Sequence, residues 1–105
     1  MNKDEALRAL AADRRQIDVV DLQILELLNR RTRIVGDIGR IKRALAMRIY
    51  EPKREDEVFR NVTENNHGPL PPDAVRRVFE RIIDEMRTVQ KLRMAEKETS
   101  TEPRA

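Results

Sequence analysis

The segment DEALRALAADRRQIDVVDLQILELLNRRTRIVGDIGRIKRALAM, residues 4–47, decides the fold of this chain. It contains no proline and only two glycines, and its apolar residues recur at helical spacing. Steps of three and four residues define one continuous seam: Leu7, Leu10, Arg14, Ile17, Asp21, Ile24, Leu28, Arg31, Val35, Ile38, Lys42 and Leu45. This 3.5-residue repeat predicts a long helix that packs against other helices along its whole length.

Three members of this seam, Arg14, Arg31 and Lys42, are cations where a packed helix needs Leu or Ile. Lysine and arginine are rarely buried without a partner, and an unpaired buried charge is very costly. Either the seam opens to water at these positions, or an anion meets them inside. We favour the anion.

The length of this helix predicts a dimer. Some forty helical residues make a rod of roughly 60 Å, about twice the width of a small domain. The rest of the 105-residue chain is too short to cover such a rod, whereas a second copy can do so. The sequence therefore predicts a homodimer with intertwined long helices.

The composition limits the other possibilities. Charged residues make up 39% of the chain and aromatics 3%, which favours helices with charged outer faces over a β-sandwich. The absence of cysteine excludes disulfides, thiolate metal sites and thiol nucleophiles. There is no basic block or aromatic platform for nucleic acid, and no apolar run of membrane-spanning length. The first residues lack the apolar core of a signal peptide, so we expect a cytoplasmic protein.

Proline and glycine divide the chain into three helices. The first should end near residues 47–50, because Pro52 cannot continue it, and the second should run from about Pro52 to Glu64. The third should span about Pro72 to Ala95, and the polar tail 96–105 should be disordered. The inward side of the second helix is predicted to comprise Val58, Phe59 and Val62, and that of the third Val75, Val78, Phe79, Ile82, Ile83, Met86, Val89 and Gln90. We therefore predict an all-α fold, long–short–long, with one helical domain of residues 1–95.

The order and spacing of several motifs resemble one family. The motifs are Leu10-x-x-x-Arg14-x-x-Ile17-Asp18-x-x-Asp21-x-x-Ile24-Leu25-x-Leu27-Leu28-x-x-Arg31, then Gly39-x-x-Lys42, then Glu51-Pro52-x-Arg54-Glu55. Together they are similar to the all-helical (AroQ-type) chorismate mutases over about residues 7–92. The resemblance implies an intertwined homodimer with two active sites, each borrowing one arginine from its partner. It also implies the concerted rearrangement of chorismate to prephenate in phenylalanine and tyrosine biosynthesis, with no cofactor and no metal.

The resemblance assigns the carboxylate-binding residues. Chorismate carries two carboxylates, which are the anions that the cationic seam requires. Arg31 matches a carboxylate-binding arginine of the same subunit, Arg14 the arginine donated across the dimer, and Arg54 a third basic residue. Bidentate guanidinium–carboxylate pairs would hold the substrate in its folded conformer, which removes much of the entropic barrier.

The resemblance also assigns the residues that act in the transition state. Lys42 matches the lysine at the ether oxygen, where negative charge develops, and Gln90 matches its amide partner on the third helix. Glu55 matches the acceptor of the ring hydroxyl. Glu51 either contacts the same hydroxyl or caps the second helix. Met86 departs from the pattern, because some relatives carry a small hydroxyl residue there and a thioether cannot donate a hydrogen bond.

Two other functions are compatible with the sequence. An isochorismate-pyruvate lyase shares the fold, but that relative lacks a carboxylate directly after the arginine of the second helix, so Glu55 favours the mutase. The second alternative is a non-catalytic helical regulatory or dimerisation module, fused to or partnered with a shikimate-pathway enzyme. The retention of the whole polar set argues against a degenerate pocket.

Overall fold

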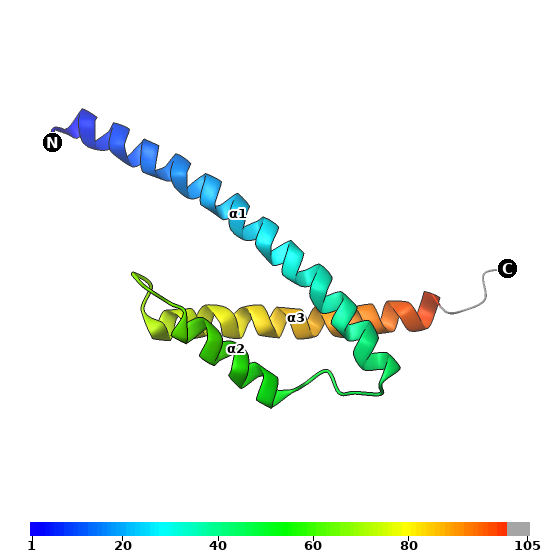
Figure 1. Ribbon diagram of the computed structural model, residues 1–105. Coiled ribbons are helices and arrows are strands. Elements are labelled where there is room, and N and C mark those ends of the chain that lie inside the picture. The colour runs from blue at the N-terminus through cyan, green and yellow to red at the C-terminus, as the bar shows by residue number, and fades with distance from the viewer. Residues whose placement is uncertain (101–105) are drawn as a thin grey trace. The chain divides into compact units, whose positions relative to one another are not determined.

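The computed structural model is all-α and describes residues 1–100, with side chains up to Arg93. Its elements are α1 (Lys3–Ala44), α2 (Pro52–Glu64) and α3 (Pro72–Ser100), and residues 1–100 contain no strand (Figure 1). The predicted order of long, short and long helix is confirmed. The chain forms two units whose boundary lies within α1: residues 1–33, and the residues from Ile34 onward.

The N-terminus of α1 is closed by its own side chains. The backbone N–H of Glu5 donates to Asn2 Oδ1 at 2.8 Å, and the Asn2 amide donates to Glu5 Oε1 at 3.1 Å. This reciprocal pair satisfies one of the backbone donors that every helix start leaves free. Acidic residues occupy the first turn and basic residues the last, which suits the helix dipole.

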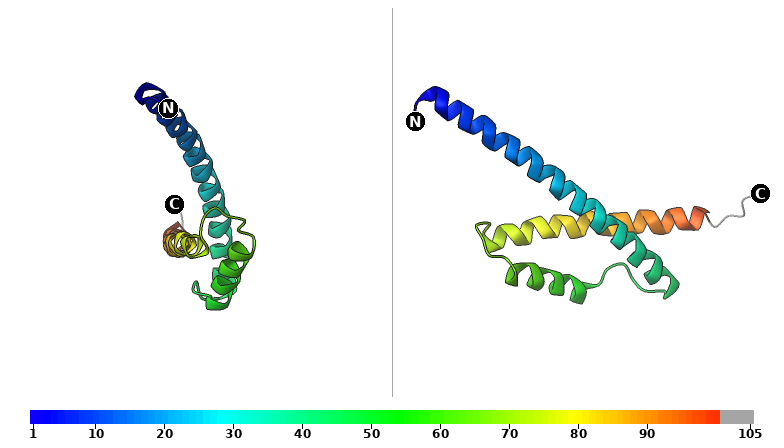
Figure 2. Two further views of the ribbon diagram at one scale, coloured as in Figure 1. Left: turned by 90° about the vertical axis from the view of Figure 1, so that its left-hand side faces the viewer. Right: turned by 45° about the horizontal axis from the view of Figure 1, so that its top comes forward.

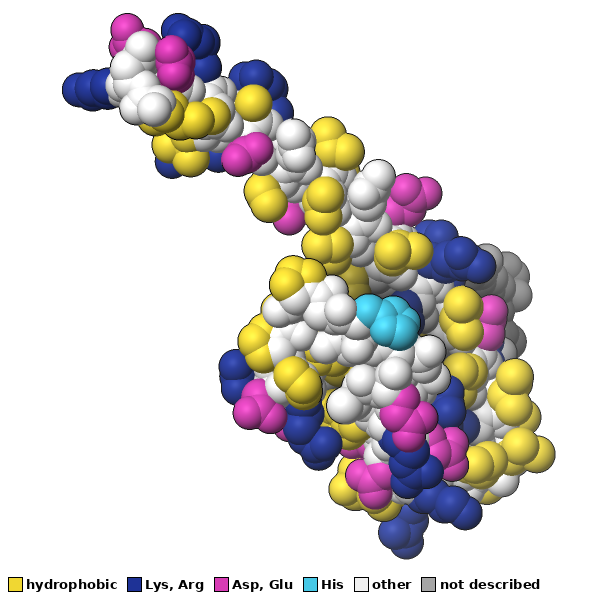
Figure 3. Space-filling view, turned by 60° about the vertical axis from the view of Figure 1, so that its left-hand side comes forward, with side chains coloured by type: hydrophobic (Ala, Val, Ile, Leu, Met, Phe, Trp, Pro, Cys, Tyr) yellow, Lys and Arg dark blue, Asp and Glu magenta, His cyan; other side chains and the backbone are white. Residues whose placement is uncertain are grey.

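The first unit consists of Met1, Asn2 and the part of α1 up to Arg33, and it buries none of its 33 residues. The apolar residues of its seam are largely exposed to solvent: Leu7 is 53% exposed, Ile17 59% and Ile24 48%. Figure 3 shows hydrophobic side chains on the surface along this stretch. A patterned apolar face without cover marks an interaction surface.

Helix α1 ends earlier than residues 47–50, where the sequence placed its end. It stops at Ala44, because Ala46 takes the left-handed conformation with φ 55°. The N–H of Ala46 then bonds to the carbonyl of Arg43 at 3.1 Å, and that of Met47 bonds to the carbonyl of Lys42 at 2.8 Å. This is the Schellman arrangement, which satisfies the last carbonyls of a helix.

Helices α2 and α3 lie side by side and form most of the second unit (Figures 1 and 2). The range predicted for α2 is confirmed, with Pro52 in the first turn. The loop between the two helices turns at Gly68, which has a positive φ of 75°. The apolar side chains buried in this unit are Val35 from α1, Phe59 from α2, and Val75, Ile83 and Met86 from α3.

Two predictions for α3 are corrected. Val78 was expected to face inward but is 50% exposed, because it lies roughly 100° around the helix from half-buried Phe79, on the edge of the apolar stripe. The helix also continues five residues beyond Ala95, to Ser100. The predicted end of the third helix is therefore corrected, disorder of the tail stays a prediction, and residues 101–105 lie outside the described part of the chain.

The left-handed alanine leads to a stability prediction. Ala46→Gly should raise the free energy of unfolding by about 0.5–1 kcal/mol, because glycine takes positive φ without steric cost and this gain exceeds the extra entropy of its unfolded chain. Ala44→Gly, two residues earlier and still helical, should lower it by about the same amount. Denaturant unfolding at one fixed protein concentration measures both. A loss of stability in Ala46→Gly would contradict the assigned helix end.

Candidate functional site

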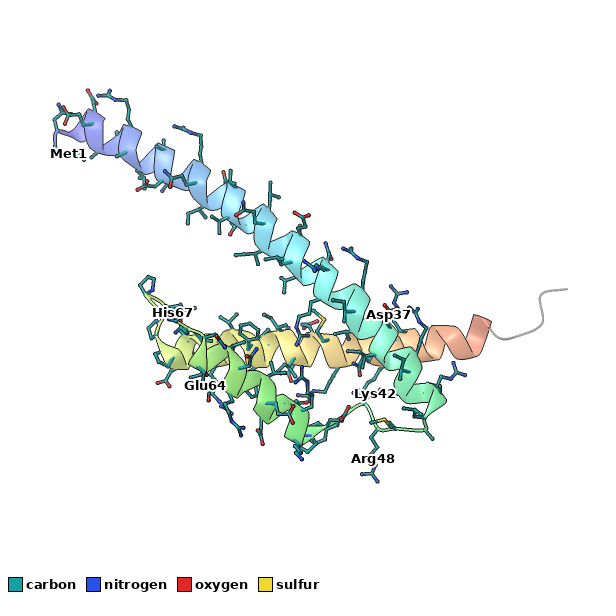
Figure 4. All side chains as sticks on the ribbon, viewed as in Figure 1. Met1, Asp37, Lys42, Arg48, Glu64 and His67 are labelled. Carbon is teal, nitrogen blue, oxygen red and sulfur yellow. The ribbon has the colours of Figure 1, made fainter. Side chains whose placement is uncertain are left out.

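Lys42 is a buried cation in the last turn of α1. Its side chain is 10% exposed, and its Nζ lies 2.9 Å from Glu51 Oε1 and donates to the carbonyl oxygen of Ile49, also at 2.9 Å. Both partners belong to the connection between α1 and α2. Figure 4 labels Lys42 on α1 and Arg48 in this connection. The sequence predicted that a cation buried at this position needs an anionic partner, and the chain itself supplies one.

Glu51 stands at the N-cap position of α2 but makes no side-chain capping hydrogen bond there. Its carboxylate forms an ion pair with Lys42 instead. Of the two roles considered from the sequence, helix capping by this side chain is therefore wrong. Contact with a substrate hydroxyl stays a prediction.

Gln90 is the second buried polar side chain, at 7% exposure, and it lies on α3. A Cβ built on Gly39 would sit 3.6 Å from Gln90 Cγ, so α1 and α3 approach closely at this point. Gly39 precedes Lys42 by three residues, which puts both on one side of α1. The close contact of the two helices thus brings Lys42 and Gln90 to the same region of the second unit.

The Gln90 amide is incompletely satisfied. Its Oε1 is buried and has no hydrogen-bond partner among the described residues. Such a group costs about 1–3 kcal/mol, and most buried polar atoms avoid the cost by finding a partner. A buried amide that keeps an unused acceptor in the same region as a buried lysine is suited to binding a polar ligand. Met86, one turn earlier, is 7% exposed and part of the apolar core.

Glu55 is held by an arginine that the sequence reasoning missed. Arg87 Nε lies 3.2 Å from Glu55 Oε2 without hydrogen-bond alignment, and Arg87 Nη2 donates to Glu55 Oε1 at 3.4 Å. Arg87 lies three residues before Gln90, so the two occupy neighbouring positions on α3. The helical spacing between Arg87 and Gln90 is the sequence feature that could have identified Arg87 as a site residue. Arg54 instead makes an exposed ion pair with Glu57 at 3.2 Å.

The remaining two predicted site residues belong to the first unit. Arg14 is exposed and Arg31 is half-buried. Their roles as carboxylate ligands stay predictions. The structure thus brings Lys42, Glu51 and Gln90 into one region of the second unit and adds a separate Glu55–Arg87 pair there.

An open hollow of about 380 Å³ lies elsewhere on the second unit. Its lining comes from α2 and α3: Asp56, Phe59, Arg60, Thr63, Glu64 and Arg76. Arg76 stacks over the Phe59 ring at 4.4 Å from its centroid, which fills part of this surface. None of the predicted site residues lines the hollow, and its mixed charges select no ligand class. Among the described residues, no group of three or more His, Asp or Glu side chains could hold a metal ion, and no helix could span a membrane.

Comparison with known proteins agrees with this geometry. A family model described as chorismate mutase type II matches residues 13–91. A bifunctional chorismate mutase/prephenate dehydratase from Neisseria gonorrhoeae is 38% identical over 82 residues. That match covers 78% of this chain but 22% of the relative, so the chain spans about a fifth of that protein's length.

Solved structures give the same result. The chorismate mutase (form II) of Thermus thermophilus superposes with a TM-score of 0.77 at 35% identity, over 79% of this chain and 94% of that one. The chorismate mutase of Helicobacter pylori, solved in complex with prephenate, gives a TM-score of 0.80 at 26% identity, over 85% and 97% of the two chains. With the family model matching most of its length, this chain belongs to the chorismate mutase type II family.

Proposed function

We propose that this chain rearranges chorismate to prephenate. The observation that carries the proposal is the combination of a buried ammonium, Lys42, with a buried and incompletely satisfied amide, Gln90, where α1 meets α3. Membership of the chorismate mutase family supports it, as does the likeness to the prephenate-bound Helicobacter pylori enzyme.

Lys42 and Gln90 are assigned to the ether oxygen of the breaking C–O bond. Negative charge develops there in the transition state, so donors at this place bind the transition state more strongly than the substrate. The Lys42 ammonium has three donors, one of which is given to the Ile49 carbonyl, and its charge is paired with Glu51. Rotation of the Gln90 amide about its last side-chain bond would present its N–H groups.

Glu55 and Arg54 are assigned to substrate holding. Glu55 is the acceptor for the ring hydroxyl, and at 20% side-chain exposure it is partly shielded from water. Arg54 is 66% exposed and paired with an exposed glutamate. Because such a surface pair contributes only about 0.2–1 kcal/mol, Arg54 can leave it for a substrate carboxylate at small cost. Met86 closes the site as an apolar neighbour of Gln90.

We further propose a homodimer in which Arg31 of one chain and Arg14 of its partner complete the carboxylate-binding set. Two facts support the dimer: α1 has 42 residues, which makes it roughly 60 Å long, and residues 1–33 bury no side chain of their seam. A second copy can cover that seam and donate a guanidinium at once. A cytoplasmic location, and a partner or fused pathway enzyme, stay predictions from the sequence.

The test of the function is to offer the purified chain chorismate and, separately, isochorismate. We expect chorismate to be consumed and prephenate to appear in equal amount, measured by chromatography. Pyruvate formed from isochorismate alone would identify an isochorismate-pyruvate lyase and overturn the proposal. Absence of both products, and of binding to either dianion, would identify a non-catalytic module.

Lys42 should matter more for turnover than for binding. Lys42→Ala should lower kcat by roughly 100- to 1,000-fold, as expected when one donor to a developing oxyanion is removed, and change KM by a smaller factor. Lys91→Ala, an exposed lysine next to Gln90, is the matched control and should leave both constants near wild type. Steady-state kinetics on folded variants, checked by circular dichroism, measure this. An effect confined to KM would remove Lys42 from the ether oxygen.

The shared site predicts complementation between two inactive variants. Arg14→Ala and Arg31→Ala should each be nearly inactive alone. In a mixed dimer, one site loses both arginines and the other keeps both, so refolding an equal mixture should restore roughly a quarter of wild-type activity if the chains combine at random and each site acts independently. Native mass spectrometry verifies that mixed dimers form. Mixed dimers without recovered activity would rule out the proposed sharing.

A further inference from the structure

Arg87 connects the site residue Glu55 to α3. Its guanidinium contacts the Glu55 carboxylate through Nε and Nη2, at 3.2 and 3.4 Å, and donates from Nη2 to Asp84 Oδ1 at 2.8 Å. It also lies over the Tyr50 ring, with Cζ 5.4 Å from the centroid. The guanidinium is therefore held by residues of α3, of α2 and of the connection before α2.

The contact with Asp84 is the shorter one, but the contact with Glu55 is the better shielded. The Asp84 side chain is 56% exposed, whereas that of Glu55 is 20% exposed. Water and salt screen an exposed pair much more than a partly buried one. Asp84 therefore acts mainly as a surface anchor for the guanidinium, and the Glu55 pair is the one in which orientation has a consequence.

The Arg87 guanidinium meets both oxygens of the Glu55 carboxylate, Oε1 through a hydrogen bond and Oε2 through an ion pair without hydrogen-bond alignment, so it restrains the carboxylate at two points. A lysine ammonium, which is a single point charge, would restrain the carboxylate less. A carboxylate oxygen has room for more than one donor, so Glu55 keeps acceptor capacity while it is held. The arrangement suits a carboxylate that must point one oxygen at a substrate donor.

We propose that Arg87 is the positioning residue of the site: it fixes Glu55 so that this carboxylate meets the ring hydroxyl of the substrate. The inference rests on the proposed mutase function, and it makes Arg87 act through Glu55 rather than on the substrate itself.

A double-mutant cycle tests the inference. Arg87→Met removes the guanidinium and keeps most of the side-chain volume, and Glu55→Gln removes the charged acceptor. We expect Arg87→Met alone to lower kcat/KM by roughly ten- to a hundredfold, since misplacing a contact by about 1 Å costs up to that much. In the Glu55→Gln background it should lower kcat/KM less than twofold, because there is no longer a carboxylate to position.

A set of matched variants separates positioning from folding. Arg87→Lys keeps the charge but loses the two-nitrogen contact of the guanidinium. Compared with Arg87→Met, it should therefore recover the melting temperature more fully than kcat/KM. Arg81→Met removes the exposed arginine that pairs with Glu85 on the same helix at 2.8 Å, and it should leave kcat/KM near wild type. If Arg87→Met fails to fold, Arg87→Lys in both backgrounds completes the cycle.

Three outcomes would overturn the inference while wild type remains an active mutase. The first is an equal loss from Arg87→Met in both backgrounds, which would place Arg87 directly on the substrate. The second is full kcat/KM in Arg87→Met. The third is a loss in Arg87→Lys that follows the melting temperature alone, which would make the role structural. An inactive wild type would refute the proposed function instead.

Discussion

The structure of the site depends on one constraint: the Lys42 ammonium is buried and must be held. A buried charge without partners would cost several kcal/mol. The chain meets this cost by folding the segment after α1 back onto the lysine. The Lys42 backbone carbonyl accepts from Met47, and its Nζ binds the Ile49 carbonyl and the Glu51 carboxylate. Lys42 thus takes part both in the hydrogen bonds that close the end of α1 and in the contact proposed for the transition state.

This double use explains the form of the connection between α1 and α2. The left-handed turn at Ala46 sends the chain back toward Lys42, and Pro52 then starts α2 directly after Glu51. The same helix start carries Glu55, whose carboxylate turns toward α3 and Arg87. Local backbone chemistry in about ten residues therefore positions two of the charged groups proposed to act on the substrate.

The sequence predicts most of this fold and part of this site. Periodicity was sufficient for the three helices and for the burial of Lys42 and Gln90, because both signals lie within single helices. It was insufficient for the end of α1, since the left-handed position holds an alanine where glycine or asparagine would have been recognisable. It also missed Arg87, because the pairing with Glu55 spans 32 residues and depends on how α2 and α3 align.

Charge balance within the second unit sets a further requirement. Three of its cations near the proposed site are already matched by carboxylates, and the pairs are Lys42–Glu51, Arg54–Glu57 and Arg87–Glu55. A dianionic substrate would therefore find little net positive charge there. To reach one of these cations, the substrate would have to displace the carboxylate that is already paired with it, which makes its binding weaker. In the proposed dimer, Arg31 and the partner's Arg14 would supply additional cations. Arg14 lies on a helical stretch that buries nothing in its own chain, so in the proposed dimer one second copy would both cover that stretch and supply the missing charge.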